Sequence, residues 1–177
     1  MNCIHCGSGN IEERGWLKSG KKQRYCRDCT KWFSGEGAPK ILLFDIETSH
    51  TLFRLWDTGE QYVRADQIAR DWFVICWSAK WLFDSKISSD VVTSMEAIQG
   101  NDKRVIRGIH KLLSQADIVI TQNGDKFDIK KLQWKFIKYG LPPNNKYHSI
   151  DTYKKSRQLI DPPSFGLDGI AQALGFG

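Results

Sequence analysis

From residue 41 onward, the hydrophobic positions are first spaced as in β-strands. Four apolar residues, 41–44, run into Asp45, Ile46 and Glu47, which is typical of a buried strand. The segment 51–59 alternates moderately, and we expect it to pair with the first strand as a hairpin. Residues 71–83 predict a third strand, and residues 89–95 predict either a weaker strand or a loop.

The pattern then alternates between helix and strand. Apolar residues recur at helical spacing in 101–115, and 116–124 returns to a strand that breaks at Asn123-Gly124. Residues 125–140 predict a helix that ends at Gly140. Residues 148–159 begin as a short strand, and 164–177 open another helix. Three strands followed by alternating helix and strand predict an α/β layer with a mixed sheet.

Composition narrows the class of protein. The chain has 177 residues, of which 41% are hydrophobic, enough for one medium domain and a small appendage. It contains no run of 18 apolar residues and no visible secretory signal, so we expect a cytoplasmic protein without a membrane partner. A net charge of +6 suits a polyanionic partner such as nucleic acid.

Four of the five cysteines form two CxxC pairs, Cys3/Cys6 and Cys26/Cys29, with 19 residues between the pairs. Two such knuckles predict a tetrahedral Cys₄ site for structural Zn²⁺. The alternative is four unrelated thiols. His5 lies inside the first knuckle, and we expect it not to be a ligand. These observations predict a zinc ribbon at 1–36, a linker at 37–40 and a larger domain at 41–177.

The predicted ribbon combines basic and aromatic residues. Residues 1–40 hold eight Lys or Arg and four acids. Basic groups bind phosphates and aromatic rings stack on bases, so we expect nucleic-acid contacts from Lys21, Lys22, Arg24, Tyr25, Lys31 and Trp32. The alternative is that the rings form the ribbon's own core beneath a solvated charged face. The segment 20–35, GKKQRYCRDCTKWFSG, resembles the second knuckle of the zinc ribbons that begin transposases.

A group of acids suggests a second metal site. Asp45 and Glu47 alternate along one strand, so their side chains point to the same face. Asp128 falls in the first turn of the predicted helix after Gly124, where its side chain reaches the sheet edge, and Asp125 is better placed as a helix cap. Two facing carboxylates are tolerated when a cation lies between them. The alternatives are acids satisfied by backbone N–H groups and a plain helix N-terminal charge.

The sequences FDIET (44–48) and NGDKFD (123–128) resemble the first and second motifs of the DEDD superfamily of 3′–5′ exonucleases. This resemblance spans 40–177 and implies a ribonuclease H-like fold. It implies that Asp45 bridges two ions of Mg²⁺ or Mn²⁺, that Glu47 orients the attacking water, that Asp128 supports the second ion, and that Asn123 contacts the nucleic acid. The implied reaction is hydrolysis of DNA with a free 3′ end, with a replication or repair protein as a further partner.

The third motif of that family, a Tyr or His four or five residues before an Asp, is expected after 177. We therefore expect a C-terminally incomplete enzyme; a naturally short, inactive relative is the other reading. The alternative function is a non-catalytic nucleic-acid-binding protein on the same fold. The ribbon also leaves open a transposase-like nuclease.

Overall fold

A computed structural model describes residues 2–16, 22–34, 39–144 and 146–176, except for the side chains of 16 and 22. The chain divides into two units, Met1–Lys40 and Ile41–Gly177. The expected linker at 37–40 lies partly outside the described residues, so its limits stay a prediction. No helix in the described ranges reaches the length and apolarity needed to cross a membrane.

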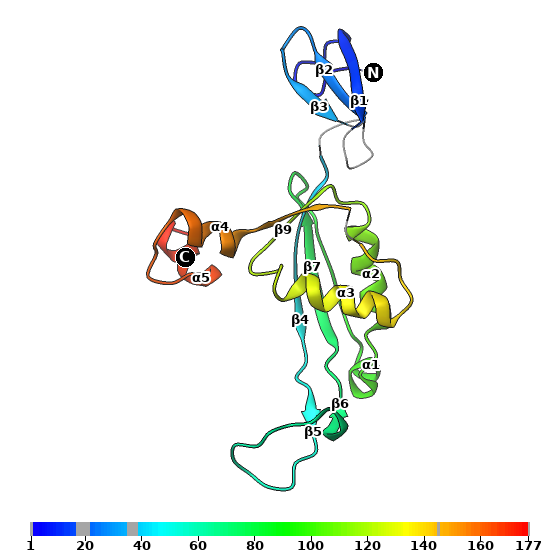
Figure 1. Cartoon of the computed structure of the whole chain (residues 1–177), viewed down its shortest axis with the longest axis vertical. Coiled ribbons are helices and arrows are strands. Elements are labelled where there is room, and N and C mark those ends of the chain that lie inside the picture. Colours follow the sequence, from blue (N-terminus) through cyan, green and yellow to red (C-terminus); the bar gives the residue numbers. More distant parts are fainter. Residues whose placement is uncertain (1, 17–21, 35–38, 145, 177) are drawn as a thin grey trace. The chain divides into compact units, whose positions relative to one another are not determined.

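The small unit is a three-stranded antiparallel sheet (Figure 1), made of β1 (Ile11–Trp16), β2 (Lys22–Cys26) and β3 (Trp32–Ser34) in that order. Its buried apolar cluster consists of Cys3, Cys26 and Phe33. A core of two thiols and one ring buries too little apolar surface to fold a segment of this length by itself.

The large unit is built on a five-stranded mixed sheet with the order β10-β9-β4-β7-β8. The central strand β4 runs antiparallel to β7 and parallel to β9, and β10 is parallel to β9. This confirms the predicted α/β fold with a mixed sheet. The five strands are β4 (Ile41–Thr48), β7 (Val74–Trp81), β8 (Ile87–Val91), β9 (Ile118–Thr121) and β10 (His148–Asp151).

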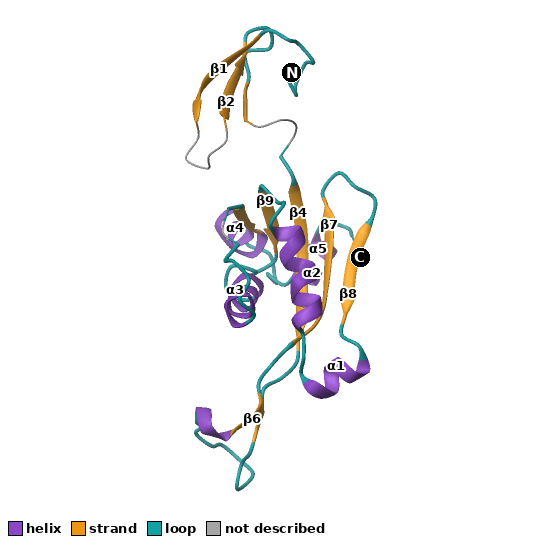
Figure 2. Cartoon of the chain, turned by 90° about the vertical axis from the view of Figure 1, so that its right-hand side faces the viewer, coloured by secondary structure: helices purple, strands orange, loops and turns teal. Residues whose placement is uncertain are grey.

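Two helices cover one face of this sheet (Figure 2), α2 (Lys103–Leu113) and α3 (Asp128–Lys138). The buried side of β4 faces them with Leu42, Phe44 and Ile46. Gly108 in α2 allows close packing, because a Cβ there would lie 3.0 Å from the Trp77 ring. The indole of Trp77 donates to the Val105 carbonyl oxygen at 2.8 Å. Both helices confirm the sequence prediction.

The expected hairpin between 51–59 and the first strand is wrong. Only β5 (Leu52–Phe53) is a strand there, and it pairs with β6 (Ile68–Arg70), which follows the short helix η1 (Ala65–Gln67). The antiparallel neighbour of β4 is β7, which offers a ladder from 74 to 81. Local alternation predicts a strand but does not identify its partner when a longer apolar ladder competes.

Three shorter helices complete the unit: α1 (Ser94–Gln99), α4 (Thr152–Leu159) and α5 (Leu167–Ala173). Helix α1 was not predicted, although Thr93 and Glu96 form a capping box at its start, a recognisable sequence signal. The helix expected at 164–177 is confirmed as α5. The uncertain segment 89–95 contains the end of β8 and the start of α1.

A buried ion pair ties α3 to the start of α2. The Lys135 ammonium lies 2.8 Å from the Asp102 carboxylate, and both side chains are at most 1% exposed. Asp102 also accepts from the Val74 N–H at 2.8 Å and from the Tyr139 hydroxyl. Burial and the neighbouring Asp102 charge raise the pKa of Tyr139, which keeps its hydroxyl a donor.

Removing one partner of this pair leaves a buried charge. We therefore expect Asp102→Ala to lower the free energy of unfolding by about 3–5 kcal/mol, measured by urea denaturation. The control is Asp71→Ala, which breaks the exposed 3.6 Å pair with Lys138 and should cost less than about 1 kcal/mol. Equal costs for the two variants would contradict this assignment.

Candidate active site

The acids of β4 occupy the face of the sheet opposite α2 and α3. Leu42, Phe44 and Ile46 are buried, whereas Asp45 and Glu47, which alternate with Phe44 and Ile46, are exposed. Across the ladder to β7, Asp45 pairs with Ser78 and Glu47 pairs with Cys76. Strand alternation therefore places both carboxylates on the open face, as predicted from their spacing.

Asp128 joins this pair from another part of the chain. It is the first residue of α3, its side chain is buried, and its Oδ1 accepts a hydrogen bond from the Ile46 N–H at 3.1 Å. Strand β9 pairs with β4 only along 41–43, so the Ile46 N–H lies beyond the end of that ladder. Asp128 therefore caps the open edge of β4 at the residue between Asp45 and Glu47.

The three acids, hereafter the acid cluster, place like charges close together. Burial, together with the Asp45 and Glu47 charges, raises the pKa of Asp128 to about 6, against the lowering effect of the Ile46 hydrogen bond. Burial and the Glu47 charge also raise the pKa of Asp45. The cluster holds negative charge at an electrostatic cost, which a divalent cation bound by carboxylate oxygens relieves.

A second buried carboxylate fixes the turn that presents Asp128. Asp151 is 3% exposed and accepts from the Asn123 N–H at 2.9 Å and the Asp125 N–H at 3.3 Å. It also accepts from the Tyr153 N–H, at the start of α4. The turn is tight: Asn123 has a φ of 58°, and a Cβ at Gly124 would lie 2.3 Å from the Thr121 hydroxyl.

Sequence reasoning missed this role of Asp151, although an Asp before a helix is a usual N-cap signal. The expectation that Asp125 caps α3 is wrong. Its carboxylate instead accepts from the Ser149 hydroxyl and from Lys154, both at 2.6 Å. Helix α3 begins without a side-chain cap. The backbone N–H of Asn123 donates to the Asp151 carboxylate.

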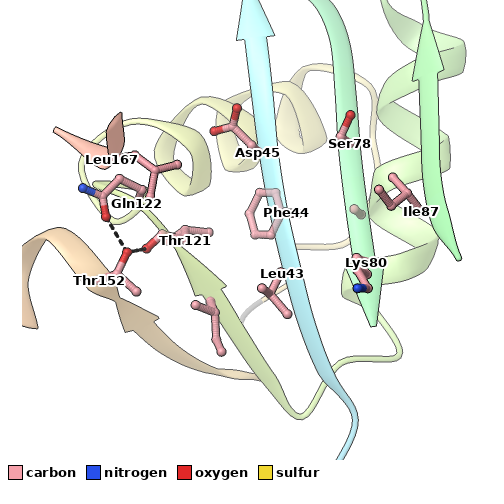
Figure 3. A pocket seen from close by; sticks show the side chains of 12 residues that line it. Leu43, Phe44, Asp45, Ser78, Lys80, Ile87, Thr121, Gln122, Thr152 and Leu167 are labelled. Carbon is pink, nitrogen blue, oxygen red and sulfur yellow. Dashed lines mark hydrogen bonds between the residues drawn. The ribbon is translucent and has the colours of Figure 1, made fainter. Parts of the chain in front are cut away.

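A pocket of about 400 Å³ opens beside Asp45 on the same face of the sheet (Figure 3). The Thr121 hydroxyl oxygen is buried and has no hydrogen-bond partner among the described residues. A molecule in this pocket would contact Asp45 directly. Its lining is mainly apolar and comes from four strands, the residue that follows β9, and two helices: Leu43, Phe44, Asp45, Ser78, Ala79, Lys80, Ile87, Ile120, Thr121, Gln122, Thr152 and Leu167.

The four paired cysteines come together in the small unit. Their sulfur atoms all lie within 4.8 Å of one another, with 3.6 Å between the sulfurs of Cys3 and Cys29 and of Cys6 and Cys26. Among the residues that the structure describes, this is the one group of three or more His, Cys, Asp or Glu that is so compact; the acid cluster is more open. Four sulfur donors fit a tetrahedral zinc site. His5 is outside the group, and its ring lies edge-on to Phe33.

The residues of the ribbon that we expect to contact nucleic acid differ in their exposure. Tyr25 and Trp32 lie with ring centroids 5.0 Å apart, and Trp32 is 51% exposed. Lys31 is exposed. Arg24 is 7% exposed and pairs with Glu13, which favours a role inside the ribbon. Lys21 and the side chain of Lys22 lie outside the described residues.

Comparison with known proteins gives a family match within the large unit. A family model described as the RNase_H superfamily matches residues 74–177. A search of curated proteins finds no match.

Three solved structures resemble the chain at low identity. The family B DNA polymerase of the archaeon Pyrobaculum calidifontis is 18% identical, with a TM-score of 0.58 over 93% of this chain and 22% of the polymerase. E. coli Exonuclease I in complex with a dT13 oligonucleotide is 14% identical, with a TM-score of 0.54 over 79% of this chain and 36% of Exonuclease I. An ExoI/SSB-Ct complex is 14% identical, with a TM-score of 0.50 over 78% of this chain and 37% of the other chain. The chain thus spans well under half of each, and the likeness shows the fold.

The raised pKa of Asp128 makes stability depend on pH. In the metal-free protein, Asp128 ionises at a pKa of about 6 when folded and about 3.9 when unfolded. Its stabilising protonated form is therefore lost as pH rises towards 7. Asp128→Asn removes this effect and retains an oxygen that accepts from Ile46.

We expect the gain in unfolding free energy from Asp128→Asn to be larger at pH 7.5 than at pH 4, measured by urea denaturation in EDTA. The exposed control Asp161→Asn should show no such difference. A gain for Asp128→Asn that is equal at both pH values would contradict the electrostatic account.

Proposed function

The chain belongs to the RNase H superfamily, and we propose that it is a metal-dependent 3′–5′ exonuclease that hydrolyses DNA. One observation carries this proposal: the Asp128 carboxylate bonds to the Ile46 N–H, directly between Asp45 and Glu47. The nuclease function in general is supported by the superfamily and by the fold shared with Exonuclease I. The 3′–5′ polarity rests on the resemblance of 44–48 and 123–128 to the DEDD motifs.

The acid cluster fits hard divalent cations, Mg²⁺ or Mn²⁺, because all its side-chain donors are carboxylate oxygens. Such ions supply charge neutralisation at the phosphate and lower the pKa of bound water. Asp45 and Glu47, on the open face, would hold them where a phosphodiester approaches. Asp128 would complete the site at the strand edge, and Asp151 would hold the turn that positions it.

The small unit would hold structural Zn²⁺ through its four cysteines. Thiolates prefer zinc, whereas the carboxylates of the acid cluster prefer magnesium or manganese, so the two sites differ in donor chemistry. The paired rings of Tyr25 and Trp32, with Lys31 nearby in sequence, would contact nucleic acid. A replication or repair protein is the proposed protein partner; one of the structural neighbours was solved with SSB-Ct.

Loss of a β4 acid should remove cleavage. With Mn²⁺ and a 5′-labelled single-stranded DNA, we expect shortening from the 3′ end, and Asp45→Asn should slow it at least about 100-fold because charge neutralisation at the phosphate is lost. Gel analysis of the product ladder measures the rate, and Asp161→Asn is the matched control, which should cleave as the wild type.

Cleavage that survives Asp45→Asn would overturn the assignment of this site. A wild-type chain that binds DNA with a steep salt dependence but does not cleave it in the presence of any divalent metal would instead establish the non-catalytic alternative. Nicking of closed circles would indicate an endonuclease.

The zinc content of the protein should depend on the four paired cysteines and not on Cys76. Cys26→Ser removes a fully buried donor, so we expect the zinc content, measured by elemental mass spectrometry, to fall from about one ion per chain to near zero. Cys76→Ser, in the other unit, is the matched control and should keep its zinc. An unchanged content in the Cys26 variant would rule out the four-cysteine site.

A further inference from the structure

The lysines of α3 have different partners, although the sequence shows them as one basic helix. Lys135 is buried against Asp102, and Lys138 lies 3.6 Å from Asp71. Both of these ammonium groups are therefore engaged with carboxylates of the protein. Lys130 is exposed. Lys131 is half-buried and shares the Trp72 ring with Lys135, whose Nζ lies 4.4 Å from the ring centroid.

The Lys131 ammonium lies between two aromatic rings. Its Nζ is 3.9 Å from the ring centroid of Trp72 and 4.8 Å from that of Phe127. Within the described parts of the chain no carboxylate comes within 4.0 Å of it. Aromatic faces attract the charge but accept few hydrogen bonds, so the ammonium keeps donors for an anion. Burial and the neighbouring Lys135 charge lower the pKa of Lys131, against the opposing effect of the Asp71 charge.

These three residues adjoin the acid cluster in the fold. Phe127 directly precedes Asp128, and Lys131 follows it by about one helical turn. On the other side, Trp72 precedes Phe73, whose carbonyl oxygen accepts from the Ser49 N–H at 2.9 Å, just past the end of β4. Phe127 and Lys131 therefore lie at the helix end that supplies Asp128 to the acid cluster, and Trp72 lies against Lys131.

The chemistry of the group matches a nucleic-acid strand. A phosphate oxygen accepts from an ammonium, and every base offers a flat face to an aromatic ring. Phe127 is 41% exposed, so one face of its ring is accessible. Trp134 is 53% exposed and lies four residues after Lys130, so the same helix carries a second ring and a second cation as neighbours.

We propose that Trp72, Phe127 and Lys131 hold a single strand of nucleic acid beside the acid cluster. Lys131 contacts a backbone phosphate, Phe127 stacks on a base, and Trp72 holds the Lys131 side chain in place. This inference rests on the proposed nuclease function for its substrate, but strand binding is measurable without cleavage.

The test is the affinity of a fluorescein-labelled dT oligonucleotide, measured by anisotropy in EDTA over about 50–200 mM salt. The variants are Lys131→Gln, Lys131→Arg and Phe127→Ala. Lys111→Gln is the matched control: it removes the same charge from an exposed position on α2. Thermal unfolding checks that each variant is folded.

We expect Lys131→Gln to weaken binding severalfold and to reduce the slope of log K against log salt by about 0.7, the loss of one phosphate contact. Lys131→Arg should restore most of the affinity. Phe127→Ala should weaken binding at least about fivefold without changing the slope. The control should bind nearly as the wild type does.

Equal affinities for Lys131→Gln and Lys111→Gln would overturn the proposal, because only general charge would then matter. So would a Lys131 variant that binds DNA normally but loses binding to a polyglutamate peptide, which would identify a protein-docking surface. A wild-type chain that does not cleave, yet shows these binding differences, would remove the nuclease function and leave the strand-binding surface intact.

Discussion

The structure of the site depends on one long-range hydrogen bond, from the Ile46 N–H to the Asp128 carboxylate. It joins residues 82 positions apart in sequence and links the N-terminus of α3 to the central strand. Because β9 ends short of Ile46, the bond also satisfies a backbone donor at the open strand edge. The same side chain therefore satisfies the backbone at this edge and brings a third acid to the two on the open face.

Support for that bond is spread over several elements. Asp151 fixes the turn before α3 through backbone N–H groups, and the Lys135–Asp102 pair fixes the last turn of the helix against the start of β7 and α2. Each support buries a charged group, which is costly unless its partners are in place. The site is thus positioned by polar groups whose partners lie in different segments of the chain.

The sequence predicted the parts of this arrangement that depend on local pattern. Strand alternation placed Asp45 and Glu47 on one face, helical spacing predicted α2 and α3, and the cysteine spacing predicted the sulfur cluster. What depends on long-range pairing was not predictable in the same way. The predicted strand partner of 51–59 was wrong because local alternation does not specify a partner. The roles of Asp151 and Asp125 depend on which segments of the chain their side chains contact.

The central claim is that the acid cluster binds divalent cations, and the most direct measurement is an anomalous-scattering map from crystals soaked in Mn²⁺. The account predicts a peak within about 2.3 Å of a carboxylate oxygen of Asp45 and close to Glu47 or Asp128. A map with no peak there, in crystals whose other sites take up the ion, would contradict it.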